Sequence, residues 1–219
     1  MGMFLRRGAV ASGPKLGDTE IGTLVKLNEN GSPAAFYVAK HDYETGLNGS
    51  GRTLVVRKEC YDQRVFTTAT SGTYNDYQAS TLDSFLNNNY FAMLDPKIRS
   101  NMGKTKFYSK LYGNDGWIDS LERSIFTLSV TELGLSPTGA TAEGTALPIA
   151  SILRTLTLSG SYDGQWTRTP AQGGAAYIWV VTKAGNAQAK DWNDTNSYSR
   201  PAMTLPASFR LDDNNVVIG

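Results

Sequence analysis

The chain has 219 residues, enough for one large domain with a full hydrophobic core. Its 21 Lys and Arg residues against 20 Asp and Glu residues give a net charge of +1, without a long run of either sign. We therefore do not expect the basic face that a nucleic-acid partner requires. A single cysteine, Cys60, excludes an intramolecular disulfide and a cysteine-based zinc site.

The beginning of the chain lacks the pattern of a signal peptide, because Arg6 and Arg7 are not followed by an apolar segment. No apolar stretch approaches the ~20 residues of a membrane span, so no membrane partner is expected. Residues 1–18 have little periodicity and contain several glycines, which is typical of an extended segment. We predict an N-terminal arm over residues 1–18 and one domain over residues 19–219.

The first elements are predicted to be strands. Residues 22–27 and 34–39 are joined by Asn30-Gly31, a dipeptide that strongly favours a β-hairpin. Residues 52–58 form another short β run. The loop before it, residues 48–51, reads Asn-Gly-Ser-Gly and requires positive φ.

The centre of the chain is predicted to be helical. Ser80 and Asp83 fit the first and fourth positions of a capping box, and Leu82, Phe85 and Leu86 follow on one helical face. A second helix is predicted to begin at Asp95-Pro96, to bury Ile98 and Met102, and to end at Gly103.

The remaining elements are mostly short strands. We predict strands at 104–111, 124–130, 176–183 and 216–218, and a third, short helical segment at 148–156. Residues 166–170 are expected to precede the strand at 176–183. Strands, then helices, then strands again indicate an α+β fold of mostly antiparallel short strands with two helices.

The order of these elements, together with several short sequence words, resembles a family of phage and prophage domains of C-type-lectin-like fold. The resemblance covers roughly residues 17–217, and its words are GTLVKL (22–27), LVVRK (54–58), YQASTL (77–82) with FLN (85–87), TELG (131–134), WTRTP (166–170), WVV (179–181) and RPA (200–202). One departure is Arg64-Val65-Phe66, which stands where many members carry a Trp-rich stretch.

The resemblance implies a domain that begins and ends in one sheet, with two helices packed on it. It also implies a virion protein that is assembled in the host cytoplasm and exposed on a tail, baseplate or surface appendage. Expected partners are other virion proteins, copies of the chain in a homo-oligomer, and a host-surface glycan or protein. The fold is similar to those of variable proteins of diversity-generating systems and of formylglycine-generating enzymes, but fold alone does not transfer function.

No catalytic set is evident. Formylglycine generation needs two reactive cysteines, and Cys60 stands alone. His41 is the only histidine, and at the end of a predicted strand it is more typical of a solvated loop than of a dyad with Cys60. A glycosidase pair among the scattered carboxylates stays open. We expect no enzyme and no cofactor.

Two groups of oxygen-bearing residues are candidates for calcium. Neither follows the EF-hand pattern, so we interpret both as turns and caps and predict no metal site. The groups are Asp191, Asn193, Asp194 and Asn196, and Asp212, Asp213, Asn214 and Asn215.

We interpret two short segments that each contain an arginine as braces inside the fold. Trp166 and Arg168 lie just before a strand, in the segment WTRTP that the resembling family shares. We expect Arg168 to be at least partly buried and bonded to backbone carbonyls. Arg200 and Pro201 are predicted to act similarly. The alternative for Arg168 is a surface site that binds a carboxylate or stacks on a ring.

The predicted binding surface lies between residues 177 and 198. Larger side chains alternate with small ones there, which on a strand places the larger ones on one face. Exposed Trp, Tyr and Asn side chains suit stacking on sugar rings and bonding to hydroxyls. The alternative is that Trp192 belongs to the core and the rest is an ordinary loop. The predicted binding residues are Tyr177, Gln188, Lys190, Trp192, Asn193, Asn196 and Tyr198.

The leading hypothesis is a non-enzymatic virion protein that displays this C-terminal surface to a host receptor or glycan. The alternative is a purely structural capsid or tail protein held by its N-terminal arm. A third hypothesis is a polysaccharide or cell-wall hydrolase.

Overall fold

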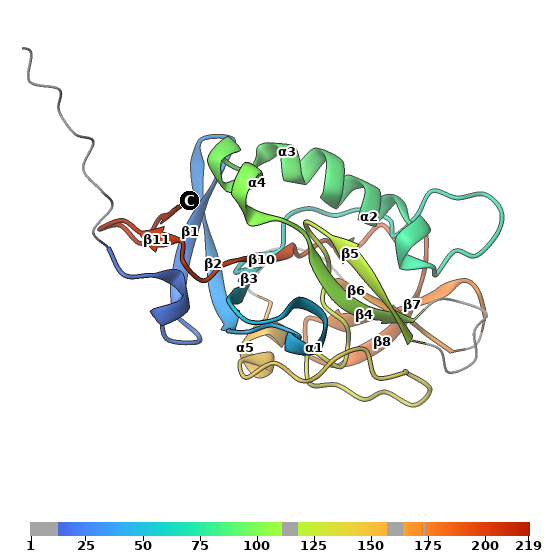
Figure 1. Ribbon diagram of the computed structural model, residues 1–219. Coiled ribbons are helices and arrows are strands. Elements are labelled where there is room, and N and C mark those ends of the chain that lie inside the picture. Colours follow the sequence, from blue (N-terminus) through green and yellow to red (C-terminus); the bar gives the residue numbers. More distant parts are fainter. Residues whose placement is uncertain (1–12, 111–117, 157–163, 173) are drawn as a thin grey trace, which may run out of the picture.

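In the computed structural model, which describes residues 13–110, 118–156, 164–172 and 174–219, curled antiparallel sheets lie beside short helices (Figure 1). This combination of helices and mostly antiparallel sheets agrees with the predicted α+β class. Among the described residues, no helix is both long and apolar enough to cross a membrane.

The first sheet has the strand order β1-β2-β3-β10. Its strands are β1 (Leu24–Glu29), β2 (Ser32–Lys40), β3 (Arg52–Arg57) and β10 (Ala202–Pro206). Asn30 and Gly31, with φ of 50° and 79°, form the tight turn between β1 and β2, so the predicted hairpin is confirmed. Positive φ at Gly49 (68°) and Gly51 (85°) confirms the predicted loop before β3.

The second sheet has the order β8-β7-β6-β9, with β9 parallel to β6. Its strands are β6 (Gly164–Pro170), β7 (Tyr177–Thr182), β8 (Ala187–Asp191) and β9 (Ser197–Tyr198). Residues 166–170 precede the strand β7 as predicted, but they also lie in the buried inner strand β6, which was not predicted. Alternating Thr residues hid this strand, since a strand covered on both faces has no amphipathic pattern.

A two-stranded sheet is formed by β4 (Thr105–Lys110) and β5 (Ile118–Arg123). The strand predicted at 124–130 was wrong. That segment has a single bridge, between Phe126 and Ala202, and most of its other amides donate to side chains. Asn87 Oδ1 accepts from the amides of residues 124 and 125 at 3.0 and 3.2 Å, and Thr169 Oγ1 accepts from that of residue 130 at 3.1 Å. The apolar residues of this segment are therefore buried although the segment is not paired as a strand.

Helices lie on two opposite sides of the molecule, along the top and along the bottom of Figure 1. They are the 3-10 helices η1 (Leu16–Asp18) and η2 (Tyr77–Ala79), α1 (Thr45–Asn48), α2 (Thr81–Phe85), the π-helix η3 (Leu86–Tyr90), α3 (Phe91–Met93), α4 (Pro96–Met102) and α5 (Ala150–Arg154). α5 lies inside the helical segment predicted at 148–156.

The predicted helix starts are largely confirmed. Ser80 Oγ accepts from Asp83 N at 3.0 Å, but the Asp83 carboxylate bonds to Arg123 Nε at 2.7 Å and does not complete a capping box. At α4, Asp95 caps by accepting from Lys97 N at 2.8 Å, and Gly103 ends the helix with φ of 67°. Ile98 and Met102 are buried, as the pattern predicts.

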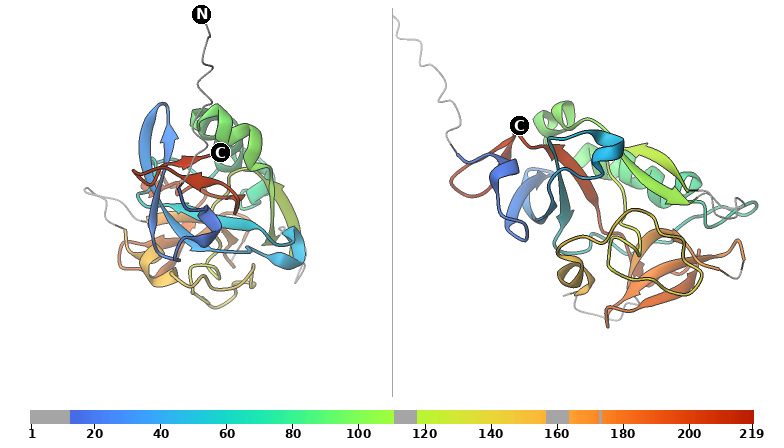
Figure 2. Two further views of the ribbon diagram at one scale, coloured as in Figure 1. Left: turned by 60° about the vertical axis from the view of Figure 1, so that its left-hand side comes forward. Right: turned by 60° about the horizontal axis from the view of Figure 1, so that its bottom comes forward.

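The two ends of the described chain lie side by side (Figure 2). Leu16 is fully buried and its amide donates to the carbonyl of Phe209 at 2.7 Å. Lys15 bridges Arg210, near the short pair β11 (Arg210–Leu211) and β12 (Val217–Ile218). The segment predicted as an arm thus already packs on the domain at residues 13–18; residues 1–12 lie outside the described residues.

Candidate functional site

The centre of the molecule holds a buried ion pair. Arg168 Nη1 lies 2.6 Å from Glu132 Oε2, and both side chains are fully buried. Arg168 also donates to the carbonyls of Tyr108 at 2.8 Å and Thr127 at 2.9 Å. Burial alone would lower the pKa of the guanidinium, but the charge of Glu132 holds that pKa above its usual value. Arg168 therefore braces β6 against β4 and the segment at 124–130.

Further polar groups complete this network. Glu132 Oε1 accepts from the hydroxyl of Tyr43, whose pKa is raised mainly by burial and then by the Glu132 charge. Glu143 accepts from Lys110 N at 2.5 Å and from the hydroxyl of Thr169. Burial raises the pKa of the Glu143 carboxyl.

Arg200 is a second buried brace. Its guanidinium donates to the carbonyls of Arg57 at 2.8 Å and Lys58 at 2.6 Å. Burial lowers the pKa of this guanidinium. Trp166 Nε1 donates to the carbonyl of Arg64 at 2.7 Å. The residues predicted as braces are all buried, so their contacts lie within the fold. They are Trp166, Arg168, Arg200 and Pro201.

An aromatic stack lies at the end of the β7–β8 hairpin. The rings of Trp192 and Tyr74 are 4.7 Å apart between centroids and 13° from parallel, and both are half-buried. The main chain of Trp192 is fixed on both sides, since its amide donates to Ala176 O at 2.9 Å and its carbonyl accepts from Phe66 N at 2.9 Å. The main chain of Trp192 is therefore held in place, and both rings are partly exposed.

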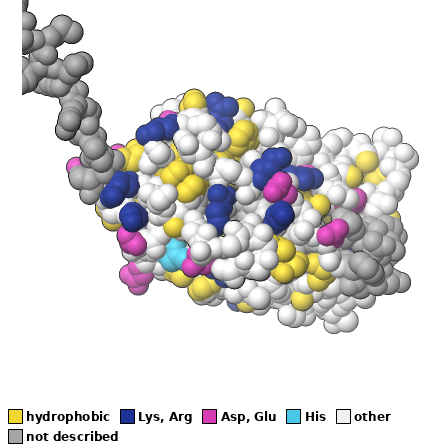
Figure 3. Space-filling view, viewed as in Figure 1, with side chains coloured by type: hydrophobic (Ala, Val, Ile, Leu, Met, Phe, Trp, Pro, Cys, Tyr) yellow, Lys and Arg dark blue, Asp and Glu magenta, His cyan; other side chains and the backbone are white. Residues whose placement is uncertain are grey.

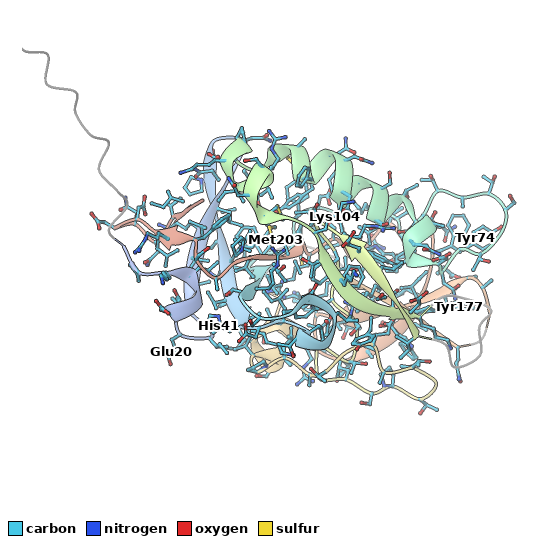
Figure 4. All side chains as sticks on the ribbon, in the orientation of Figure 1. Glu20, His41, Tyr74, Lys104, Tyr177 and Met203 are labelled. Atoms are coloured by element: carbon cyan, nitrogen blue, oxygen red, sulfur yellow. The ribbon has the colours of Figure 1, made fainter. Side chains whose placement is uncertain are left out.

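Tyr177 lies at the same end of the molecule as Tyr74 (Figure 4). Its side chain is 38% exposed, the carbonyl of Tyr177 accepts from Asn75 Nδ2 at 3.2 Å, and Tyr177 pairs with Asp191 across the sheet. Because side chains alternate along a strand, Tyr177 and Trp192 lie on opposite faces of the hairpin. We call Tyr74, Tyr177 and Trp192, with the exposed Asn193 and Asn196, the aromatic tip.

Gln188 and Lys190 lie on the edge strand β8, next to the aromatic tip. They share a face with Trp192, as the alternation predicts, and their partners on β7 are the buried Val180 and Ile178. Gln188 is exposed and Lys190 half-buried. The alternative that Trp192 is core is partly supported, since one side of its ring packs on the core cluster.

Tyr198 is the one predicted binding residue that lies elsewhere. It belongs to β9, at the opposite edge of the sheet from β8, and packs on Cys60 and Leu156. Tyr74, in turn, was missed by the sequence analysis. The available signal was an aromatic residue within the polar stretch at 70–76, and such a loop aromatic often belongs to a surface.

The acidic clusters of the sequence serve turns. Asp194 accepts from Asn196 N at 3.2 Å and Ser197 Oγ at 2.6 Å. Asp212 accepts from Asn214 N and Val216 N, both at 2.8 Å. No group of three or more metal-ligating His, Cys, Asp or Glu side chains occurs in the described part of the chain.

His41 and Cys60 are each engaged separately. The ring nitrogens of His41 lie 3.0 Å from Thr53 Oγ1 and 2.8 Å from Thr19 O. Cys60 is buried, and burial raises the pKa of its thiol to about 11. A protonated, enclosed thiol is a poor nucleophile, so this cysteine is suited to packing.

Comparison with known proteins gives one match. No curated protein and no solved structure matches the chain. Residues 50–207, which include the buried braces and the whole aromatic tip, match the family described as a domain of unknown function, DUF6273. The chain therefore belongs to the DUF6273 family.

Proposed function

We propose that this protein is a non-enzymatic recognition domain whose aromatic tip binds a glycan of a host cell surface. The observation that carries the proposal is the partly exposed stack of Trp192 on Tyr74, in which main-chain hydrogen bonds hold Trp192 in place. Aromatic faces pack against the apolar faces of sugar rings, and amides such as Asn193 and Asn196 bond to hydroxyl groups. Because main-chain hydrogen bonds hold Trp192 in place before binding, less conformational entropy is lost on contact.

The proposal includes a C-type-lectin-like arrangement and a place on the outside of a phage particle. The sequence words that resemble phage and prophage domains support it, as does the meeting of the two ends of the domain near β11 and β12. The surface agrees with a glycan partner in one further respect. On the face shown in Figure 3, basic side chains have acidic ones beside them. This face therefore has no basic patch that would favour a polyanion.

The test is a titration of the purified chain with oligosaccharides prepared from bacterial surface polysaccharides, followed by calorimetry and intrinsic tryptophan fluorescence. We expect saturable binding that Tyr74→Ala weakens at least tenfold. Trp192→Phe, which keeps the core contact, should weaken binding less. Tyr198→Phe at the opposite sheet edge is the matched control and should bind as the unchanged protein does, while circular dichroism verifies folding of each variant.

Two results would overturn the proposal. One is binding that Tyr74→Ala and Asn193→Ala leave unchanged, or no binding to any polysaccharide fraction. The other is the release of reducing sugar or wall fragments during incubation, which would show a hydrolase.

A further inference from the structure

The outer edge of β8 differs from the other edges of the two four-stranded sheets. Those three edges are bridged by segments of the same chain. Leu94 and Val216 bridge to β1, and Phe126 and Gln63 bridge to β10 and β9. Among the described residues, β8 has no strand or bridge beyond its pairing with β7. An edge of this kind presents main-chain groups that can pair with another strand.

The main-chain groups that point away from β7 can be identified from the hydrogen-bond pattern. Trp192 N donates to Ala176 O at 2.9 Å, and pairs in an antiparallel ladder alternate, so every second residue of β8 before Trp192 also bonds to β7. The residues between them, Ala187, Ala189 and Asp191, direct their N–H and C=O groups outward. Those of Ala187 and Ala189 bond to nothing else in the described chain.

β8 also lacks two features that usually protect an edge strand. It contains no proline, and its register with β7 runs without a shift, so no bulge bends it away. Ala189 is exposed, and its small side chain leaves room for another strand. Lys190 lies opposite Ile178, so its side chain leaves the strand toward a face of the sheet and not along the edge. In the right-hand view of Figure 2, the orange strands of this sheet lie at the lower end of the molecule, away from the C-terminus.

The sequence of β8, AQAKD, suits pairing with a second copy of itself. A two-fold dimer pairs the strand antiparallel, with its centre at a residue whose main chain points outward. A centre at Ala189 places Ala187 opposite Asp191 and Gln188 opposite Lys190, so no like charges lie directly opposite each other. A centre at Asp191 would oppose two carboxylates, and a centre at Ala187 would meet the turn of the hairpin.

We propose that two copies of the chain pair through β8, centred on Ala189, and join their second sheets into one continuous sheet. Trp192 is the third residue after this centre, so the two Trp192 residues lie about 20 Å apart along the paired strands. One consequence rests on the proposed function. Two aromatic tips at this separation can bind two parts of one polysaccharide chain, which raises the apparent affinity.

Sedimentation equilibrium of the full chain tests the pairing. It uses no glycan, so failure of the pairing and failure of the proposed function are separate results. We expect a monomer–dimer equilibrium. Ala189→Pro removes an outward N–H and places a ring where the second strand approaches, but it removes no bond to β7. Its dimer dissociation constant should increase about tenfold or more. Ala189→Thr keeps the N–H and favours a strand, so it should change this constant less than about threefold. Circular dichroism verifies folding of both variants.

Cysteine cross-linking tests the register without a proline. The Cα atoms of a hydrogen-bonded antiparallel pair lie about 5.5 Å apart, which a disulfide can span. Ala189→Cys should therefore form a covalent dimer with oxidised glutathione. Asp191→Cys is the matched control and should not, because the two Asp191 positions lie four residues apart along the paired strands. The native Cys60 is buried in both variants. A chain that stays monomeric, a dimer that Ala189→Pro leaves unchanged, or a covalent dimer of Asp191→Cys in place of Ala189→Cys would overturn the proposal.

Discussion

Glu132 neutralises Arg168 in the centre of the molecule, where neither charge reaches water. Removal of one member of a buried pair leaves the other charge without compensation, at a cost of roughly 3–5 kcal/mol. We therefore expect Glu132→Gln to lower the free energy of unfolding by about that amount, as measured by urea denaturation.

An exposed ion pair provides the contrast. Lys58 Nζ and Glu59 Oε1 are 3.6 Å apart, with both side chains well exposed. Glu59→Gln should change the free energy of unfolding by less than about 1 kcal/mol. Similar losses of unfolding free energy in the two variants would show that burial does not make the Arg168–Glu132 pair more important for stability than an exposed pair.

Glu143 makes the same network sensitive to pH. Burial raises the pKa of its carboxyl above 4.5 in the folded chain, so the folded state holds this proton more tightly than the unfolded state does. The stabilising contribution is complete below the unfolded pKa and is lost as pH rises through the folded pKa. Glu143→Gln has no such proton, and Thr169 Oγ1 can turn to accept from the new amide.

We expect the stability of Glu143→Gln, relative to the unchanged chain, to increase from pH 4 to pH 7. Urea denaturation at each pH measures this difference. A difference that stays constant or falls over this range contradicts the raised pKa.

Residue-level prediction worked where one side chain carried enough information. Arg168 was expected to be at least partly buried because its segment lies just before a strand and is shared with the family that the sequence resembles, and its bonds to carbonyls agree with that expectation. Its partner Glu132 lies 36 positions away in the sequence, so no local pattern identifies the pair.

At the scale of elements, α4 shows that local signals suffice when the chain itself supplies the cap. Asp95 accepts from Lys97 N at 2.8 Å and Pro96 follows at the first helical position. Loss of an Asp N-cap costs about 0.5–2 kcal/mol, because helix-end amides then lack an acceptor.

We expect Asp95→Ala to lower the free energy of unfolding within that range. Ser100→Ala, an exposed change on the same helix, should have an effect within about 0.5 kcal/mol. Thermal and urea denaturation followed by circular dichroism check both. An equal effect of the two substitutions would show that the Asp95 cap does not stabilise α4.

Other elements depend on partners that the sequence does not reveal. Residues 124–130 are apolar enough for a strand, but side chains of Asn87, Tyr77 and Thr169 take the bonds that a neighbouring strand would make. The hairpin at Asn30-Gly31 was predictable because its turn conformation is fixed by two adjacent residues. The parallel pairing of β9 with β6 joins positions far apart, so it was not predictable.

For the whole molecule, closure of the chain ends makes the fold one unit. Leu16 and Val217 belong to the same core cluster as Trp166 and Val180 at the far sheet. Three of the four tryptophans, Trp166, Trp179 and Trp192, lie in or directly after the strands of that far sheet, and Trp117 lies outside the described residues. With Trp117 replaced by Phe, tryptophan fluorescence reports on the half of the molecule away from Leu16.

Leu16→Ala tests this coupling. Truncation of a fully buried leucine costs roughly 2–5 kcal/mol, whereas Lys15→Ala next to it, on the surface, should cost little. If one continuous core unfolds cooperatively, the loss at Leu16 must shift the fluorescence transition of the distant tryptophans by the same amount as the circular-dichroism transition. A fluorescence transition that stays in place while circular dichroism moves would mean that the β6–β9 sheet unfolds independently. In that case the aromatic tip would rest on a separate unit, and its rigidity would have to come from the second sheet alone.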